Sequence, residues 1–442
     1  MSDPASQLQG VVRSWRRSVF FLLFALILAP AAFAVSGFLP QERLGYRNGD
    51  QWEPAMAADI HGHVYVLYPQ YGAVPDCSRC TIPTMALLIS NDSGVSWEPS
   101  RVLLPFPTGE FDPQIAVDPV DHQTVYASWL QNRKRDVIVA RSLDFGRTWS
   151  YAVAERGTED ADKPVLTVRG VDVYVGFNHD EELFVAASHD AGQTFNLVNV
   201  NPNAPPGSSL AGGATVDLAG NVYFGWTEYA RHDMATQPVN VYLSRSADGG
   251  RTWNTVLLDV SSAPPACAAQ SCETGFLGAQ IALASDSSGA LYALWNAGGS
   301  NQGPERIYFS SSTTAGASWS ARANVSDAAA GVEHCFPAIV AGTAGDVRIA
   351  WMDARMPDTG HPNRRLWNTF YRSSTNGGAT WSPELRLSGP ASGYDYIQPN
   401  GFRFPFGDYF SMAIDGEGTT HTVWGEGRNY KSPGSIWYTR GR

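Results

Sequence analysis

Acidic, arginine and tyrosine residues recur at the ends of apolar, strand-like runs along this 442-residue chain. Those that follow a run ending in tryptophan are Glu228, Asp353, Arg355, Glu426 and Arg428. Those that come just before a run are Asp112, Asp408 and Tyr409. Carboxyl groups can exchange protons and guanidinium groups can hold an anion, so these residue types could do acid–base chemistry on a bound ligand. The same types also form ion pairs, so Asp353 and Arg355 could equally form an ion pair that ties adjacent blades together.

The elements that must position these residues are short β-strands. Apolar residues alternate with small or polar ones in paired runs broken by Asp, Gly or Asn, which is typical of β-hairpins. Seven such pairs occur, at residues 55–68, 114–129, 165–177, 214–226, 281–295, 338–351 and 410–424. A third and a fourth strand follow most pairs, and no stretch has helical periodicity. We therefore predict an all-β fold, a β-propeller of four-stranded antiparallel blades, with seven blades, or six if one pair is an insertion.

A repeated motif, S-x-D-x-G-x-[ST]-W, lies between the third and fourth predicted strands. Its six copies begin at Ser90, Ser142, Ser188, Ser246, Ser312 and Ser374. Their third positions hold Asp92, Asp144, Asp190, Asp248, Thr314 and Asn376. Such self-similarity indicates a repeat architecture. Ser and Asp side chains can hydrogen-bond turn backbone and Gly supplies a positive φ, so we predict a structural role for every copy.

The seventh unit lacks both the motif and a fourth strand. Because a closed ring hides the edges of its sheets, we predict that a segment within residues 36–50 completes this blade. Consecutive loops of a blade alternate between the two faces of a propeller. The repeated motifs are therefore expected on one face, and the candidate residues on the other.

Residues 1–34 have the composition of a signal peptide. Three arginines precede an apolar run, and an Ala-x-Ala pattern ending at Ala34 supplies a cleavage site. Apolar character continues to about Phe38, so an uncleaved membrane anchor is the alternative. We expect residues 35–52 to form an N-terminal segment, residues 53–442 to form the propeller, and the protein to be secreted or periplasmic.

Five cysteines fit an exported protein, because disulfides persist in oxidising compartments. The close pairs predicted to form disulfides are Cys77 with Cys80 and Cys267 with Cys272. Zinc with Cys335 and His334 as further ligands is the alternative, although no standard zinc spacing occurs. The formal net charge of −11 argues against a nucleic-acid partner. We expect no cofactor, a monomer, and membrane contact only if the N-terminal segment stays uncleaved.

The repeated motif resembles the Asp box of the Asp-box (BNR) repeat proteins in the sialidase superfamily, and the resemblance covers nearly all of residues 50–442. That superfamily includes sialidases, other glycosidases and non-catalytic binding propellers, so the resemblance bears on fold more than on activity. Residues 402–405 read Phe-Arg-Phe-Pro and resemble the F-R-I-P motif whose arginine binds the substrate carboxylate in sialidases. Here Phe404 replaces the isoleucine, and the motif lies near the C-terminus instead of before the first blade.

Resemblance to sialidases implies retaining hydrolysis, in which three arginines hold a carboxylate, a tyrosine paired with a glutamate attacks, and an aspartate is the acid/base. Loop position selects Arg355, Arg403 and Arg428 for the anion, Tyr409 with Glu228 for the nucleophile pair, and Asp112 for the acid. Asp353, Asp408 and Glu426 are further candidates for substrate binding. The expected function is an exo-α-sialidase-type glycoside hydrolase acting on glycans. The alternative is a non-catalytic propeller of the cell envelope that binds a glycan or a protein.

Overall fold

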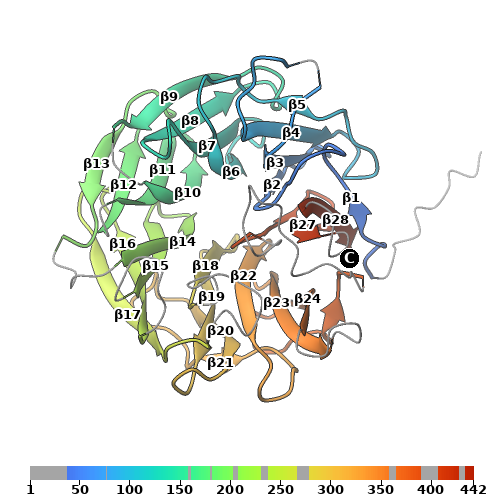
Figure 1. The fold of residues 1–442 in the computed structure, drawn as a ribbon. Coiled ribbons are helices and arrows are strands. Elements are labelled where there is room, and N and C mark those ends of the chain that lie inside the picture. Colours follow the sequence, from blue (N-terminus) through green and yellow to red (C-terminus); the bar gives the residue numbers. More distant parts are fainter. Residues whose placement is uncertain are drawn as a thin grey trace, which may run out of the picture. The chain divides into compact units, whose positions relative to one another are not determined.

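The computed structural model describes residues 37–75, 77–157, 161–179, 182–202, 208–229, 237–265, 278–357, 365–389, 407–427 and 434–442. Residues 35–442 form one compact unit. In its described part the regular structure is all β, as seven four-stranded antiparallel sheets arranged as blades around a ring (Figure 1). The predicted seven-bladed propeller is therefore confirmed. The described part has no helix long and apolar enough to cross a membrane.

Each blade runs from an inner first strand to an outer fourth strand. Blade 1 contains β2 (Ala55–Ala58), β3 (Val64–Gln70), β4 (Thr84–Ser90) and β5 (Arg101–Val102). Blade 2 contains β6 (Phe111–Val117), β7 (Val125–Gln131), β8 (Asp136–Ser142) and β9 (Ser150–Glu155). Blade 3 contains β10 (Asp162–Arg169), β11 (Asp172–His179), β12 (Glu182–Ser188) and β13 (Asn196–Asn199). Blade 4 contains β14 (Ser208–Val216), β15 (Val222–Tyr229), β16 (Val239–Ser246) and β17 (Asn254–Ser261).

The remaining blades complete the ring. Blade 5 contains β18 (Ile281–Ser285), β19 (Leu291–Gly298), β20 (Glu305–Ser312) and β21 (Ala323–Asn324). Blade 6 contains β22 (His334–Ala341), β23 (Val347–Pro357), β24 (Arg365–Ser374) and β25 (Leu385–Arg386). Blade 7 contains β26 (Ser411–Ile414), β27 (Thr420–Gly427), β28 (Gly434–Gly441) and β1 (Glu42–Arg43). First strands of successive blades contact one another, and β26 contacts β2, so the inner strands surround a common axis (Figure 1).

The outer strand of blade 7 comes from the opposite end of the chain. In the pairing of β1 with β28, Glu42 lies opposite Tyr438 and Arg43 lies opposite Trp437. The Asp50 carboxylate also accepts the backbone N–H of Gly434 at 2.8 Å. These contacts join the first described residues to the last strand, within the segment that was expected to complete this blade. The ring therefore has no open seam at blade 7, and an edge that could pair with another chain is covered.

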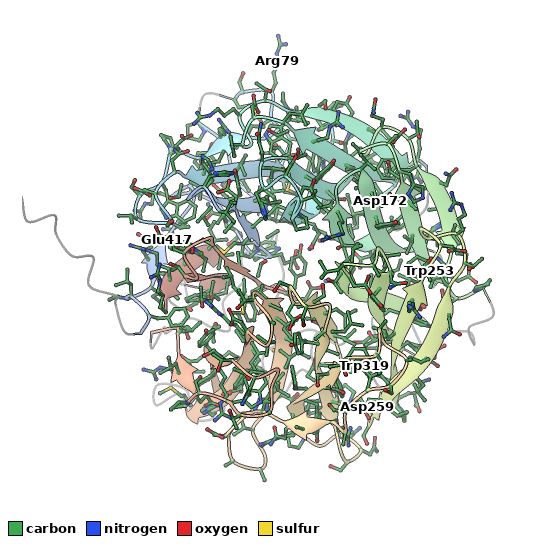
Figure 2. All side chains as sticks on the ribbon, turned by 180° about the vertical axis from the view of Figure 1, so that it is seen from behind. Arg79, Asp172, Trp253, Asp259, Trp319 and Glu417 are labelled. Carbon is green, nitrogen blue, oxygen red and sulfur yellow. A yellow bond between two sulfur atoms is a disulfide. The ribbon has the colours of Figure 1, made fainter. Side chains whose placement is uncertain are left out.

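Apolar side chains fill the spaces between neighbouring blades. The five tryptophans that end or nearly end a second strand are each at most 2% exposed: Trp129, Trp226, Trp295, Trp351 and Trp424. The tryptophans of the repeated motifs are less buried and lie on the outer part of their blades, as Trp253 and Trp319 show in Figure 2. Burial of such large rings contributes much of the stability of a β-sheet protein. Most of the aromatic content therefore serves the scaffold.

Every copy of the repeated motif forms the turn between a third and a fourth strand. In blade 2 the Asp144 carboxylate accepts bonds from the Thr148 backbone N–H at 2.8 Å and the Thr148 hydroxyl at 2.7 Å. The buried Ser142 hydroxyl accepts the N–H of Gly146, whose φ is 76°. In blade 5, Thr314 takes the aspartate's place and accepts the N–H of Ser318 at 2.9 Å. The side chains of the motif therefore hold the backbone of the turn, which is the structural role that we predicted.

A second recurring aspartate, which the sequence analysis did not single out, closes the turn between first and second strands. It follows the first strand in five blades, as Asp59, Asp118, Asp217, Asp286 and Asp415. Asp217, for example, accepts the backbone N–H groups of Ala219 and Asn221, both at 2.9 Å, and the hydroxyl of Tyr223 at the same distance. The turns on this face are therefore held by two repeated sets of carboxylates.

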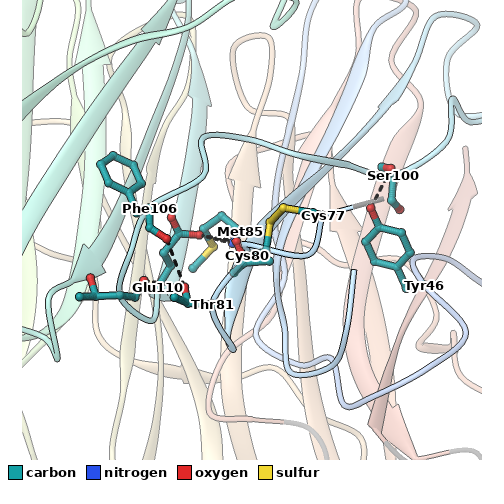
Figure 3. Close-up of a disulfide and its surroundings, with 10 residues drawn as sticks. Tyr46, Cys77, Cys80, Thr81, Met85, Ser100, Phe106 and Glu110 are labelled. Atoms are coloured by element: carbon teal, nitrogen blue, oxygen red, sulfur yellow. Dashed lines mark hydrogen bonds between the residues drawn. A yellow bond between two sulfur atoms is a disulfide. The ribbon is translucent and has the colours of Figure 1, made fainter. Parts of the chain in front are cut away.

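The cysteine pair in blade 1 is a disulfide. Cys77 and Cys80 are joined with a Cα–Cα distance of 5.5 Å, in the loop between β3 and β4 (Figure 3). The neighbouring Thr81 hydroxyl donates to the carbonyl of Thr108 at 2.8 Å, which attaches this loop to the segment leading into blade 2. Cys335 is a free thiol buried in β22. Cys267 and Cys272 lie outside the described residues.

Candidate functional site

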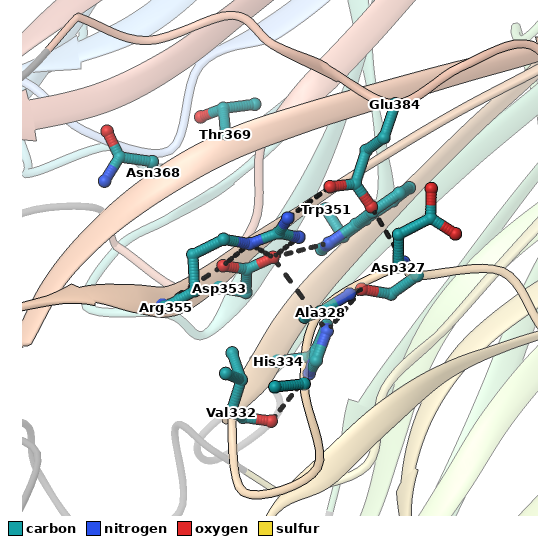
Figure 4. Close-up of polar contacts among 12 residues, drawn as sticks. Asp327, Ala328, Val332, His334, Trp351, Asp353, Arg355, Asn368, Thr369 and Glu384 are labelled. Carbon is teal, nitrogen blue, oxygen red and sulfur yellow. Dashed lines mark hydrogen bonds and ion pairs between the residues drawn. The ribbon is translucent and has the colours of Figure 1, made fainter.

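Arg355 and Asp353, at the end of β23, form an ion pair with each other. Arg355 donates from Nε to Asp353 Oδ1 at 2.8 Å, bonds Glu384 through Nη1, and lies 3.7 Å from the centre of the Phe370 ring (Figure 4). Asp353 is fully buried and also accepts the indole N–H of Trp351 at 3.0 Å. These two residues therefore form an ion pair, but it lies within blade 6 and does not tie adjacent blades. Arg355 is bonded to two carboxylates.

Glu426 and Glu228 also bond within their own blades. Glu426 is fully buried and accepts the indole N–H of Trp424 at 2.8 Å, as Asp353 does one blade earlier. Glu228 accepts from the Asn240 side chain at 2.9 Å and from the Tyr242 hydroxyl at 3.1 Å. Glu228 is thus bonded to the adjacent strand β16, and the structure does not pair it with Tyr409. Arg403 and Arg428 lie outside the described residues.

Asp112, Asp408 and Tyr409 do come together, along with residues that the sequence analysis did not assign. We call this group the axial cluster, and it consists of Glu53, Asp112, Lys134, Asp162, Lys163, Asp408 and Tyr409. The charged groups that act on Glu53 are Lys163, Lys134 and Asp162, together with the Asp112 carboxyl. The carboxylates that act most strongly on Tyr409 are Glu53 and Asp112. Glu53 thus takes the place beside Tyr409 that Glu228 was expected to fill.

The first strands position most of this cluster. Glu53, Asp112 and Lys163 each precede a proline at the start of a first strand, and their φ angles are 52°, 54° and 49°. A proline disfavours the right-handed helical region for the residue before it, and positive φ is uncommon for residues other than glycine. The pairing register shifts just after Asp112, where the strand bulges. Strained backbone of this kind is concentrated at functional sites.

The same dipeptide could have revealed Glu53 in the sequence. Four blades have a proline in or directly before the first strand. These prolines are Pro54 in blade 1, Pro113 in blade 2, Pro164 in blade 3 and Pro337 in blade 6. Comparing the residue before each proline aligns Glu53 with Asp112, Lys163 and Phe336. That alignment places three charged residues on the ends of neighbouring inner strands.

Glu53 and Asp112 form a buried carboxyl pair. Glu53 is 1% exposed and Asp112 is 5% exposed. Burial raises the pKa of Glu53, and burial raises the pKa of Asp112 to about 7, with the neighbouring carboxylates adding to the rise and Lys134 opposing it. Burial and the neighbouring carboxylates favour the protonated form of such carboxyl groups, because two of them cannot both ionise at low cost out of water. The pair is therefore suited to holding or transferring a proton.

Gly407 makes room for this pair. A Cβ atom at Gly407 would lie 2.3 Å from Cγ of Glu53, and the φ of Gly407 is 68°. Both the space and the backbone conformation therefore require glycine at this position. Blade 7 thus approaches blade 1 closely at the point where Glu53 is held.

Each lysine of the axial cluster is paired with an aspartate. Lys134 Nζ lies 2.6 Å from Asp162 Oδ1 and 3.4 Å from Asp112 Oδ2. Lys163 forms an ion pair with Asp408, and its Nζ lies 5.3 Å from the centre of the Tyr409 ring. Burial would raise the pKa of Asp162, but Lys134 and Lys163 outweigh it and hold that pKa below its usual range. The two ammonium groups are therefore largely neutralised by their partners.

A cavity of about 200 Å³ lies beside the cluster on the axis. Residues of all seven first strands or the segments leading into them line it, and Lys163, Asp408 and Tyr409 are among them. Burial, followed by the charges of Glu53 and Asp112, raises the pKa of Tyr409 well above its usual value. Tyr409 is therefore a neutral phenol, and its hydroxyl donates to the Pro113 carbonyl at 3.4 Å. Its proton can leave only to a nearby base.

An aromatic stack adjoins the carboxyl pair. The rings of Trp52 and Tyr71 are stacked, with their centres 4.2 Å apart and an angle of 24° between their planes. Burial, then Glu53 and Asp112, raises the pKa of Tyr71 well above its usual value. Among the described residues, no group of three or more His, Cys, Asp or Glu side chains is arranged to hold a metal ion. The carboxyl, ammonium and phenol groups of the described site can take part in acid–base and hydrogen-bonding chemistry.

Together the fold and the site define a seven-bladed β-propeller with a carboxyl-rich cluster at an axial cavity. No protein-family model matches the chain, and no curated protein matches it. Among solved structures it is similar to a protein of unknown function from Dyadobacter fermentans DSM 18053, at 13% identity over 91% of this chain and 98% of that chain, with a TM-score of 0.50. It is also similar to an ulvan lyase of polysaccharide lyase family PL25, at 13% identity over 89% of this chain and 95% of that chain, with a TM-score of 0.50.

A sialidase is also among the similar structures. The Hadza microbial sialidase Hz136 is 15% identical to this chain, with a TM-score of 0.44. The match covers 89% of this chain and 66% of the sialidase chain. Identities this low show the propeller fold alone. Any activity of the present chain must therefore be argued from its own side chains.

Proposed function

We propose that the axial cluster is the active site of a glycoside hydrolase. The observation that carries the proposal is the Glu53–Asp112 pair, two buried carboxyl groups that lie near the same lysines and Asp162 and whose pKa values burial raises. Cleavage of a glycosidic bond generally uses one protonated and one ionised carboxyl group. The adjoining cavity is lined from all seven blades and by Tyr409 of the cluster, so a sugar bound there would contact Tyr409.

The residues take distinct roles in this proposal. Asp112 donates its proton to the leaving-group oxygen as the glycosidic C–O bond breaks. The Tyr409 hydroxyl attacks the anomeric carbon and transfers its proton to Glu53, which is needed because burial keeps the phenol neutral. Water then attacks the same carbon and gives a proton to Asp112, while the departing Tyr409 oxygen recovers its proton from Glu53. Both carboxyl groups return to their starting states.

An exo-α-sialidase-type activity would need free arginines for the substrate carboxylate, and the proposal does not include that specificity. Arg355 is bonded to Asp353 and Glu384 in blade 6, and Arg403 and Arg428 lie outside the described residues. The described cations of the cluster are Lys134 and Lys163, and both face carboxylates. The residues that support hydrolysis are therefore the carboxyl pair and the tyrosine.

The test is an activity screen of the purified protein against aryl glycosides, repeated with Glu53→Gln and Asp112→Asn. Each variant should lose about 10²–10⁴-fold in kcat/KM, which is the usual contribution of a positioned acid or base. Asp144→Asn is the control, because it alters a carboxylate in a turn on the other face. Thermal unfolding verifies that the variants are folded. A parent that cleaves no glycoside, or folded variants as active as the parent, would refute the proposal, and glycan binding without cleavage would favour a non-catalytic propeller.

A further inference from the structure

The charges of the axial cluster are unevenly divided. Its carboxyl groups belong to Glu53, Asp112, Asp162 and Asp408, whereas its cations are Lys134 and Lys163. Each lysine lies against a carboxylate of its own, Asp162 for Lys134 and Asp408 for Lys163. Even with one proton on the carboxyl pair, the described residues of the cluster carry a net negative charge.

The cluster also presents an unoccupied hydrogen-bond acceptor at the cavity. Asp408 lines the cavity and is 6% exposed, and while Oδ2 pairs with Lys163, Oδ1 is buried without a hydrogen-bond partner among the described residues. A buried acceptor without a partner is unfavourable, so a ligand there is favoured if it brings a donor. Hydroxyl, amide and ammonium groups are donors. A carboxylate or a sulfate ester offers only acceptors and adds like charge in a poorly solvated place.

We propose that this site accepts sugars without acidic groups, such as hexoses, N-acetylhexosamines and amino sugars, and disfavours sialic and uronic acids. Asp408 and Asp162 are then specificity-determining residues, because they neutralise the two lysines that could otherwise hold an anionic sugar. This inference rests on the proposed hydrolase function and names its substrate class. It also differs from what resemblance to sialidases would suggest.

The test compares kcat/KM for uncharged aryl hexosides and N-acetylhexosaminides with that for an aryl sialoside and an aryl glucuronide. The parent should prefer the uncharged substrates by more than tenfold. Asp408→Asn frees Lys163 from its carboxylate, so the ratio should shift toward the anionic substrates by about tenfold, and Asp162→Asn should act in the same direction through Lys134. Asp346→Asn is the matched control, because it breaks a comparable pair, with Arg348 at 2.8 Å in a turn of blade 6, and should leave the ratio unchanged.

The outcomes separate this inference from the proposed function. A parent that cleaves sialosides or glucuronides as well as uncharged glycosides overturns the inference and leaves the hydrolase standing. A ratio that is unchanged in folded Asp408→Asn and Asp162→Asn removes their assignment as specificity determinants. A parent that cleaves nothing refutes the hydrolase, and a glycan array then decides the substrate class. Retention of neutral glycans on the array supports the inference, and retention of sialylated or sulfated ones contradicts it.

Discussion

The two faces of the ring use aspartate in opposite ways. On the face of the repeated motifs, Asp144 is saturated with donors, and hydrogen bonds from Thr148, backbone and hydroxyl, lower its pKa to about 2. At the axial cluster, Asp112 is buried beside another carboxyl group, and its pKa rises to about 7. One residue type therefore serves as a fixed turn anchor in one place, and in the other we propose that it serves as a proton donor. The number of hydrogen-bond donors around the carboxyl group and its access to water set its pKa, and the pKa decides which role the aspartate can take.

This contrast also explains why the conspicuous motif is not the site that we propose. The Asp144 carboxylate already accepts three hydrogen bonds within its own turn, so it has little capacity left for a ligand. Asp408 has an oxygen without a hydrogen-bond partner among the described residues, and it lies at a cavity. Incomplete satisfaction of a buried polar group is thus a better guide to the site than repetition of a motif.

The largest effect that would test the contrast is expected from Gly407→Ala. The new Cβ would collide with Cγ of Glu53 and displace its carboxyl group from Asp112. A displacement of about 1 Å can cost about 10²-fold in rate, so kcat/KM should fall by that order. Gly220→Ala is the matched control, because Gly220 has a φ of 80° and nothing within 4 Å of its Cβ position. Both variants should lose about 1 kcal/mol or more of stability from backbone strain, but only Gly407→Ala should lose activity. Equal activities would contradict the proposed position of Glu53.

A smaller effect is expected in the pH dependence of stability. Between the ordinary pKa of an aspartate, about 3.9, and the folded value of about 7, the unfolded chain releases the Asp112 proton while the folded chain keeps it. The free energy of unfolding therefore falls as pH rises through this window, by at most about 1.4 kcal/mol per pH unit. Asp112→Asn removes this dependence. Urea unfolding of parent and variant is measured between pH 4.5 and pH 8. The difference between their free energies of unfolding should change with pH, and a constant difference would rule out the raised pKa of Asp112.

The smallest effect is expected on the face of the repeated motifs. Ser142→Ala removes the buried hydroxyl that accepts the Gly146 N–H and donates to Asp144, both at 2.8 Å. An unpaired buried N–H should lower the free energy of unfolding by about 1–2 kcal/mol, with kcat/KM unchanged. Ser150→Ala is the control, since Ser150 is exposed and its hydroxyl makes one long bond, to the Arg141 carbonyl at 3.4 Å. Loss of activity in Ser142→Ala would show that the two faces are not independent.

The fold could be predicted from the sequence because it is encoded several times over. Alternating strands, turn residues and six motif copies all point to the same blade, so an error in one repeat does little harm. Placement of Asp112, Asp408 and Tyr409 before first strands was enough to find part of the site. Pairing of side chains was not predictable in the same way. Whether Glu228 faces Tyr409 or Tyr242 depends on side-chain direction within a blade, and strand order does not specify that.

Glu53 was missed for a related reason. It belongs to the first blade, and no motif copy precedes it to mark its position in the repeat. The lysine pairs were missed because Lys134 comes from a second-to-third strand turn and Asp162 from the next blade. Contacts between blades depend on the rotation from one blade to the next, which the spacing of motifs does not encode.

The joining of β1 to β28 has a consequence for when the site can exist. Glu53 follows the N-terminal strand closely, whereas Asp408 and Tyr409 belong to the last blade, so the two ends of the chain meet at the axial cluster. During synthesis the residues of blade 1 emerge long before those of blade 7. Until the last strand has been made, Lys163 has no Asp408 to pair with and Tyr409 is not in place. Assembly of the axial cluster therefore depends on the same two blades that close the ring.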